Sequence, residues 1–333
     1  MPWKGEKDPY RIWLSEIILQ QTRVEQGWPY YERFTTQYPT VLKLAAAADE
    51  EVFRLWQGLG YYARCKNMLA AAREVAAAYQ GKFPDTYEGI VSLKGVGAYT
   101  AAAIASFAFN LPHAVLDGNV YRVLARYFNI DTPIDSTAGK KLFTALADDM
   151  LPKNNAAEFN QSIMDFGAVV CKPQSPDCPN CPLNSHCEAY ATGTVGELPV
   201  KTKKLKIKKR HFNYLVMVHD GYVYIRKRVE KDIWQNLHEL VLLETTDELS
   251  PGQLALSQEF KKLTGKYAYQ ITQTSPLLKQ QLTHQTIFAR FIHLQFEKEL
   301  PPLDGFMAVP ISELYQYAFP KTIVSYLESL KWL

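Results

Sequence analysis

Four of the five cysteines of this chain are concentrated in one short segment, with the spacing Cys171-x6-Cys178-x2-Cys181-x5-Cys187. Four thiolates at this spacing can surround a single tetrahedral metal ion or a cubane iron–sulfur cluster, and either group would hold the segment as one compact loop. The segment also contains four prolines, which pre-bend it and lower the entropy that closing the loop would cost. The spacing favours the cluster, and a structural zinc site stays open as the alternative.

Targeting and membrane signals are absent from the sequence. It has no basic start followed by an apolar core, and no uninterrupted apolar stretch of about 18 residues. Hydrophobic residues make up 47% of the chain and charged residues 21%, which is the composition of an ordinary globular protein. We therefore expect a cytoplasmic protein with no membrane partner and no disulfide framework. The fifth cysteine, Cys65, lies in a helical run and is expected to be a buried, unreactive thiol.

The chain of 333 residues divides into a helical part and a part rich in strands. Up to about residue 170 the pattern is helical, with alanine-rich runs such as MLAAAREVAAAYQ. Further on, two β-rich runs flank Asp220-Gly221, a hairpin dipeptide. YAYQITQT and TIFARFIHLQF also indicate strands, and helical patterns occur near 251–264 and 319–330. The sequence predicts a multi-domain chain, α plus α+β. It consists of an all-α domain over residues 1–192, a basic linker over 193–210 and an α+β domain over 211–333.

The positive charge of the chain is concentrated in the linker. Residues 1–200 carry 18 basic and 21 acidic side chains, residues 211–333 carry 12 and 13, and the ten residues between them carry seven basic and no acidic ones. Such a run is typical of an exposed segment that can neutralise phosphates of a nucleic acid.

The segment LKGVGAYTA, residues 93–101, places Gly95, Val96 and Gly97 directly before an alanine-rich helix. Glycines let the backbone approach a ligand closely, and the free N–H groups of a turn that enters a helix suit a phosphate oxygen. This is the shape of a helix-hairpin-helix DNA clamp, although a lone Gly-x-Gly also occurs in ordinary turns between helices.

Two carboxylates occupy unusual positions. Glu16 lies within IWLSEIILQQT, a helix so apolar that a carboxylate in it needs a partner or a function. An apolar site would raise its pKa from about 4.3 to about 6–7, where a glutamic acid can donate a proton near neutral pH. The plainer alternative is a solvated helix face. Asp117 ends an apolar run in HAVLDGNVYRV and could simply cap the helix that follows.

Several long motifs occur in a fixed order: DPYRIWLSEIILQQTRV, GLGYYAR, LKGVGAYTA, VLDGNVYRV, the four-cysteine loop and IWQNLHEL. The set closely resembles the helix-hairpin-helix DNA glycosylases that carry an iron–sulfur cluster, and within them the adenine DNA glycosylases of the MutY type. The resemblance implies a glycosylase domain with a 4Fe-4S cluster in the loop of residues 171–187, followed by a Nudix-like domain that recognises the lesion.

The resemblance also implies roles for individual residues. Glu16 would be the general acid and Asp117 the carboxylate that faces the sugar, while Tyr99 and Asn119 would line the adenine pocket. The positions at which the family has residues that wedge the duplex or contact the lesion are Gln21, Thr22, Leu59 and Tyr61. The loop Leu282-Thr283-His284 aligns with the short polar loop that reads 8-oxoguanine, with Leu282 where an aromatic residue is more usual.

By this resemblance the protein is a monomer that flips adenine out of duplex DNA and excises it when it is mispaired with 8-oxoguanine or guanine. It would associate with the nucleoid while it acts on DNA. The residue types suit this reaction, because one acid must activate the leaving base and one carboxylate must stabilise an oxocarbenium-like state. The base must also leave the stack before it can be cut.

Tyr99 distinguishes this chain from glycosylases of the endonuclease III type, which have a lysine there that forms a Schiff base. A monofunctional enzyme is therefore expected, although Lys94 lies in the hairpin itself, where the family usually has proline. The second domain lacks the Nudix box with its metal-binding glutamates, so pyrophosphatase activity is not expected. The alternatives are an endonuclease III-type glycosylase acting on damaged pyrimidines, a non-catalytic DNA-binding homologue and an iron–sulfur redox protein.

Overall fold

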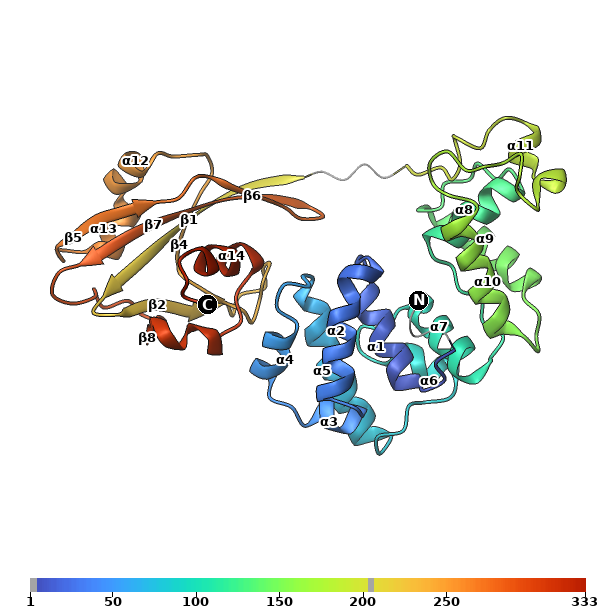
Figure 1. Cartoon of the computed structure of the whole chain (residues 1–333), viewed down its shortest axis with the longest axis horizontal. Coiled ribbons are helices and arrows are strands. Elements are labelled where there is room, and N and C mark those ends of the chain that lie inside the picture. Colours follow the sequence, from blue (N-terminus) through green and yellow to red (C-terminus); the bar gives the residue numbers. More distant parts are fainter. Residues whose placement is uncertain (1–4, 203–206) are drawn as a thin grey trace. The chain divides into compact units, whose positions relative to one another are not determined.

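A computed structural model describes residues 5–202 and 207–333 (Figure 1). Contacts divide these residues into two compact units. The first comprises residues 5–47 and 66–202, and the second comprises residues 48–65 and 207–333. The short segment 48–65 thus groups with the carboxy-terminal part of the chain. None of the helices in the described ranges combines the length and the apolar character that crossing a bilayer requires.

Residues 9–191 form helices that are joined by turns and loops. Their bounds are α1 Pro9–Leu19, α2 Val24–Gln37, α3 Val41–Ala45, α4 Asp49–Leu55, α5 Tyr62–Ala78, α6 Tyr87–Ser92, α7 Ala98–Phe109, α8 Gly118–Tyr127, α9 Thr137–Met150, α10 Ala156–Val169, the 3-10 helix η1 Asn184–His186 and α11 Glu188–Ala191. Side chains of Asp8, Thr40, Thr86 and Ser136 accept hydrogen bonds from backbone N–H groups of the first turns of α1, α3, α6 and α9. These caps satisfy donors that a helix cannot pair internally, which is why the helices begin there.

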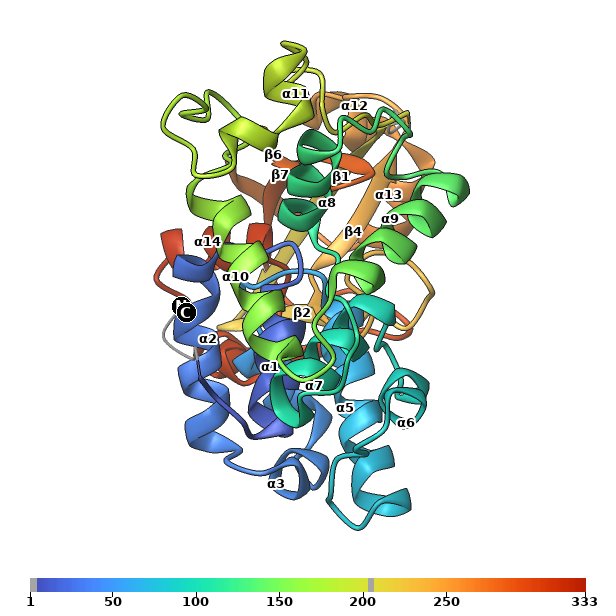
Figure 2. The ribbon, with the colours of Figure 1, turned by 90° about the vertical axis from the view of Figure 1, so that its right-hand side faces the viewer.

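Helices α1 and α7 pack against each other in the first unit (Figure 2). Trp13, Leu14 and Ile18 of α1 are fully buried, as is the alanine-rich face of α7. Small side chains on α7 let the two backbones approach closely while the large side chains of α1 fill the remaining space. A carboxylate on α1 therefore lies beside a tightly packed core.

The turn between α6 and α7 depends on one glycine. Gly95 has φ +78°, in the left-handed region that side chains disfavour, and a Cβ there would lie 2.6 Å from the Cβ of Asn67. The turn then enters α7 through Gly97, which is its N-cap. The expected helix-hairpin-helix is thus present, and only a glycine fits at position 95.

The second unit is built on one mixed sheet of eight strands. They are β1 Lys208–His219, β2 Tyr222–Lys227, β3 His238–Glu239, β4 Val241–Thr245, β5 Tyr269–Thr274, β6 Leu278–Gln281, β7 Gln285–Phe296 and β8 Met307–Pro310. The central pair, β1 and β7, is parallel and in register from Lys208 opposite Gln285 to Val218 opposite Gln295. The other pairings are antiparallel, with β2 and β4 on β1 and with β5 and β6 on β7.

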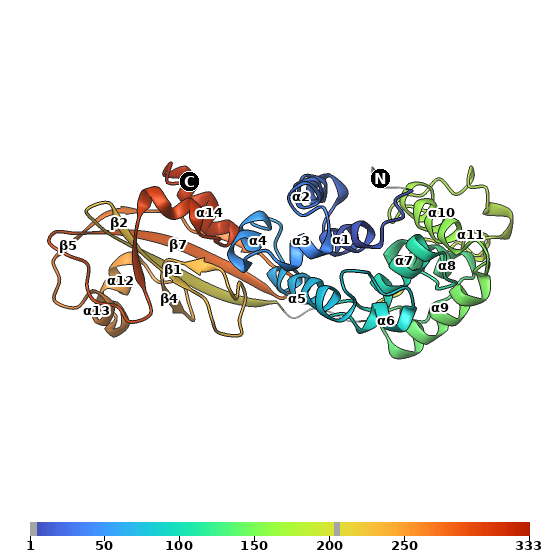
Figure 3. The same cartoon turned by 90° about the horizontal axis from the view of Figure 1, so that it is seen from below.

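Helices cover both faces of this sheet (Figure 3). On one face, Leu254 of α12 (Pro251–Leu256) and Phe260 of α13 (Gln258–Thr264) share a buried cluster with Leu215 and Ile292. On the other face, Tyr326 of α14 (Lys321–Ser329) stacks on Phe291 with ring centres 3.8 Å apart. A short 3-10 helix, η2 (Ile311–Gln316), precedes α14.

The predicted fold class is confirmed, with an all-α part followed by an α+β part. The hairpin at Asp220-Gly221 and the helices near 251–264 and 319–330 are present, and Cys65 is fully buried. The short strands β3, β4, β6 and β8 were not predicted. Strand β1 begins at Lys208, inside the segment 193–210 that the sequence predicts as linker. Residues 203–206 of that segment lie outside the described residues.

Candidate active site

Glu16 lies on α1 at the wall of a cavity of about 410 Å³. The cavity is lined by the segment before α1, by α1 itself, by the end of α7 and by α10; its lining includes Glu6, Lys7, Ile12, Ser15, Phe107, Asn110, Asn155, Glu158, Gln161 and Met164. The predicted acid is therefore neither in the core nor on an open helix face. It lies at the wall of a partly open cavity of the size that proteins use for small ligands.

Burial raises the pKa of Glu16 to about 7. Loss of hydration is the main cause, since the ionised carboxylate loses more solvation than the acid. A hydrogen bond from Tyr99 acts in the opposite direction, and the negative charge of Asp117 raises the pKa further. The same surroundings raise the pKa of Tyr99 well above its usual range, which keeps its hydroxyl a proton donor. The structure thus brings three of the predicted residues together.

Asp117 caps α8. Its Oδ1 accepts hydrogen bonds from the backbone N–H groups of Asn119 and Val120, both at 2.8 Å, and its Oδ2 accepts one from Asn119 Nδ2 at 2.7 Å. The plain capping role is therefore real, and it coexists with a position close enough to act on Glu16 electrostatically. A helix N-terminus with three donors on one carboxylate stabilises its negative charge.

A second hydrogen-bond path leads from Asn119 to the cysteine loop. Arg122, one turn further along α8, donates from Nη2 to Asn119 Oδ1 at 2.9 Å and to Gly167 O at 2.6 Å. Its Nε donates to Cys171 O at 2.8 Å. One guanidinium group therefore contacts both the predicted base pocket and the first predicted cluster ligand.

The four cysteines of the loop are free thiols, and all four line one cavity with Arg126. Arg126 donates to Cys171 Sγ at 3.4 Å and to Lys172 O at 2.7 Å. In the described ranges, no three His, Cys, Asp or Glu side chains are arranged to hold a single metal ion. Four thiols around one cavity supply the donor set that a tetrahedral zinc ion or a polynuclear iron–sulfur cluster requires.

The predicted DNA-contacting residues of the first unit, which are the hairpin residues and the wedge or lesion-contact candidates Gln21 and Thr22, lie on turns. Gly95 and Gly97 are exposed, whereas the side chain of Val96 is buried and its N–H group donates to Leu93 O at 3.0 Å. Gln21 is exposed and has φ 60°, and Thr22 is partly buried. Of the three hairpin residues predicted to contact DNA, the two glycines are exposed and Val96 is not.

Leu59 and Tyr61, the other two residues predicted to wedge the duplex or contact the lesion, differ in exposure. Leu59 is only 4% exposed, so its side chain offers no surface to a duplex, because it belongs to the core of the segment 48–65. Tyr61 is 47% exposed, and its φ of 50° is a conformation that residues with a side chain seldom adopt. The hydroxyl of Tyr61 is 2.8 Å from Thr283 Oγ1, so within the second unit the wedge candidate contacts the loop candidate. Thr283 and His284 are both exposed.

Comparisons with known proteins agree with this arrangement. Residues 14–146 match the HhH-GPD superfamily of base excision DNA repair proteins, and residues 213–329 match the NUDIX domain. A solved structure of a thermostable thymine-DNA glycosylase is similar over 58% of this chain and 88% of its own, with 30% identity and a TM-score of 0.54.

Relatives of known name match most of the chain. An adenine DNA glycosylase of Buchnera aphidicola subsp. Baizongia pistaciae is 37% identical over 238 residues, which are 71% of this chain and 67% of the relative. Another, from Buchnera aphidicola subsp. Schizaphis graminum, is 33% identical over 271 residues, covering 80% of this chain and 78% of the relative. The chain belongs to the adenine DNA glycosylase family.

Several residues around the candidate site of this adenine DNA glycosylase family member were not predicted from the sequence. Glu158, Gln161 and Met164 of α10 line the cavity that contains Glu16, and Arg122 and Arg126 hold the cysteine loop. The α10 residues are a helical turn apart, a spacing that also describes any ordinary helix face. The arginines offer a signal in the sequence, because they are four positions apart among apolar residues, where guanidinium groups require acceptors.

Proposed function

We propose that the protein excises adenine mispaired with 8-oxoguanine or guanine in duplex DNA, by hydrolysis of the N-glycosidic bond and without cutting the strand. Membership in the adenine DNA glycosylase family supports adenine as the base that is removed. The observation that carries the mechanism is the Glu16 carboxyl, which lines the cavity, has a pKa of about 7, and interacts with Tyr99 and Asp117, residues that do not themselves line it.

In the proposed reaction Glu16 protonates the leaving base. Neutral adenine is a poor leaving group, so a proton at a ring nitrogen such as N7 must be supplied as the bond breaks. A carboxyl with a pKa of about 7 is half protonated at neutral pH, whereas an ordinary glutamate would be almost fully ionised. Excision should therefore decline as the pH rises through about 7.

Asp117 is proposed to stabilise the sugar cation that develops at the anomeric carbon. Its negative charge is held by the three hydrogen bonds at the start of α8, so it needs no rearrangement to face a cation. Asn119, fixed between Asp117 and Arg122, is proposed to line the base pocket together with Tyr99. A tyrosine cannot form a Schiff base, and Lys94 is exposed on the hairpin, which supports a monofunctional enzyme.

Adenine must leave the stack before this site can act on it. We propose that the exposed glycines 95 and 97 and the exposed Gln21 contact the duplex backbone, and that Tyr61 wedges into the stack. Thr283 and His284 are proposed to read the base opposite the adenine. The contact between Tyr61 and Thr283 supports a wedge and a reader that act as one surface.

The cysteine loop is proposed to carry a 4Fe-4S cluster on Cys171, Cys178, Cys181 and Cys187. When bound, the cluster would cross-link four points of the loop and so fix the loop on α8. Arg122 and Arg126 then hold the carbonyl groups of residues 171–173 from the protein side. Iron and acid-labile sulfide in equal amounts would support this proposal, whereas zinc in a colourless, active protein would refute it.

The deciding assay uses end-labelled duplexes with adenine opposite 8-oxoguanine, guanine, cytosine or thymine. After incubation, half of each sample is heated in alkali, which cuts at an abasic site. We expect cleavage at adenine opposite the first two bases, and only in the alkali-treated half. Glu16→Gln and Asp117→Asn should bind the duplex but fail to excise. Strand cutting without alkali, or borohydride trapping of the enzyme on DNA, would refute a monofunctional mechanism.

A further inference from the structure

The turn between β6 and β7, residues 282–284, carries the two residues proposed to read the lesion; we call it the reader turn. Its backbone is held at the base. The N–H group of Leu282 donates to Gln285 O at 2.7 Å, and the N–H group of Lys208 donates to His284 O at 2.9 Å. Thr283 and His284 themselves are exposed. The position of Thr283 and His284 therefore depends on the contacts that fix Gln285 and the first residues of β1.

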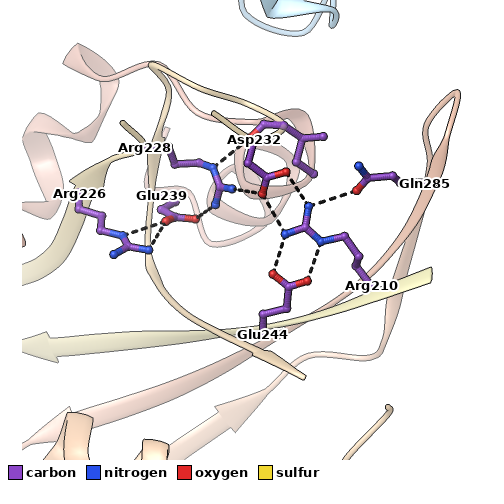
Figure 4. Close-up of polar contacts among 8 residues, drawn as sticks. Arg210, Arg226, Arg228, Asp232, Glu239, Glu244 and Gln285 are labelled. Carbon is purple, nitrogen blue, oxygen red and sulfur yellow. Dashed lines mark hydrogen bonds and ion pairs between the residues drawn. The ribbon is translucent and has the colours of Figure 1, made fainter. Parts of the chain in front are cut away.

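Arg210 contacts Gln285 directly (Figure 4). Its side chain is buried, at 10% exposure. The guanidinium group forms bidentate salt bridges with Glu244, with both distances 2.6 Å, and with Asp232, at 2.8 and 2.9 Å. The fifth guanidinium N–H donates to Gln285 Oε1 at 3.2 Å. All five donors of the group are thus in use.

The pairs continue away from the reader turn. Asp232 also accepts a hydrogen bond from Arg228 at 2.9 Å, Arg228 pairs with Glu239, and Arg226 pairs with the same glutamate at 2.9 Å. Three arginines and three carboxylates therefore balance one another in this ion-pair network. Networks of this kind add little net stability, because removing the charges from water is costly, but they fix the geometry of the side chains.

The arrangement also changes the role of the last basic residue of the segment 201–210. With every donor taken by Glu244, Asp232 or Gln285, Arg210 has none left for a DNA phosphate. Its neighbours Lys208 and Lys209 are exposed and keep that possibility. The sequence alone assigns all seven basic residues of the segment the same role toward DNA phosphates. The structure shows that Arg210 is instead paired within the protein.

We propose that Arg210 is a positioning residue for lesion recognition. Held by Asp232 and Glu244, it fixes Gln285 and thereby the reader turn, so that discrimination between 8-oxoguanine and guanine depends on the Arg210–Gln285 hydrogen bond. This inference rests on the proposed function of Thr283 and His284. It assigns to the ion-pair network a role in specificity that is separate from catalysis.

The test compares single-turnover excision of adenine opposite 8-oxoguanine and opposite guanine in the full chain. Gln285→Leu removes the acceptor and leaves both arginine–carboxylate pairs intact, so the fold is preserved. We expect the ratio of the two rate constants to fall about tenfold, equivalent to about 1.4 kcal/mol. The rate opposite guanine should change less than twofold. Gln285→Glu keeps an oxygen acceptor and should retain the ratio within about threefold.

Arg226→Met is the matched control, because it breaks the same network at its far end, where Arg226 pairs with Glu239. It should leave the ratio within about twofold of the parent protein. An unchanged ratio in Gln285→Leu, or an equal loss in Arg226→Met, would overturn the positioning role. If the parent protein itself excises adenine equally opposite both bases, the proposed lesion reading fails instead, so the two failures are distinguishable.

Discussion

Replacing Glu16 by glutamine should make the protein more stable while it abolishes excision. The fold raises the pKa of this carboxyl from 4.5 to about 7, so the folded protein holds the proton more tightly than the unfolded chain does. Stability from this group is therefore complete below pH 4.5, is lost as the pH rises from 4.5 to about 7, and stays low above that. Glutamine does not titrate and avoids the loss.

The size of the effect follows from the shift. A difference of about 2.5 pKa units at about 1.36 kcal/mol each gives an upper value of about 3 kcal/mol at pH 8.5. At pH 5 most of the unfolded chain's carboxyl is ionised while the folded one is protonated, and the same arithmetic gives less than about 1 kcal/mol. The gain of Glu16→Gln over the parent should thus grow by roughly 2 kcal/mol between these pH values.

Urea unfolding followed by helical circular dichroism at pH 5, 7 and 8.5 measures this gain, because the helices lie mostly in the first unit. Glu32→Gln, at an exposed position of α2, shows what the same chemical change does in water. A gain that does not depend on pH, or no gain at all, would show that burial does not hold the Glu16 proton. Excision measured on the same samples would separate a catalytic loss from an unfolded protein.

Four further predictions concern other residues of the proposed machinery. Tyr99→Phe removes a hydrogen bond that lowers the pKa of Glu16, so the alkaline limb of the rate profile should move to higher pH; a limb that moves to lower pH would contradict this contact. Arg122→Met removes the hydrogen-bond donor to Asn119 Oδ1, Gly167 O and Cys171 O. It should slow single-turnover excision at least tenfold, although the Arg122 side chain is not proposed to contact the base. An unaltered rate would show that the cysteine loop does not affect the active site through Arg122. Tyr61→Phe keeps the wedging ring but removes the partner of Thr283, and should lower the preference for 8-oxoguanine several-fold while flipping persists, as fluorescence of a 2-aminopurine base would report. Serine at the exposed Lys201, Lys208 and Lys209 should weaken binding to all duplexes alike and reduce the salt slope by about 0.9 for each phosphate that is no longer neutralised; a constant slope would make the segment a spacer.

The features that could be predicted from the sequence are those that depend on neighbouring residues in the chain. The hairpin turn could be predicted because Gly95 is required by its own φ, and the raised pKa of Glu16 could be predicted because the apolar residues of α1 report how the helix is buried. Asp117 had two interpretations, cap and catalytic carboxylate, and its geometry is compatible with both.

Features decided by distant partners could not be predicted. Leu59 and Tyr61 lie two residues apart in one turn, yet the first is buried and the second exposed, because packing within the second unit selects the face. The sequence does not distinguish Arg210 from its basic neighbours, because only the fold brings Asp232 and Glu244 beside it. The cavity at Glu16 needs α10, whose residues are 140 or more positions away in the chain.

The parallel pairing of β1 with β7 has a consequence for synthesis of the chain. The first residue of β1 is 77 positions before its partner in β7, so at about 5–20 residues per second β1 waits roughly 4–15 s after it emerges from the ribosome. During that time one edge of an apolar central strand has no neighbour, a state that favours pairing with other chains. A chain that ends between β4 and β7 would keep this edge permanently. Chains truncated between β4 and β7 should therefore be more prone to aggregate than chains truncated before β1.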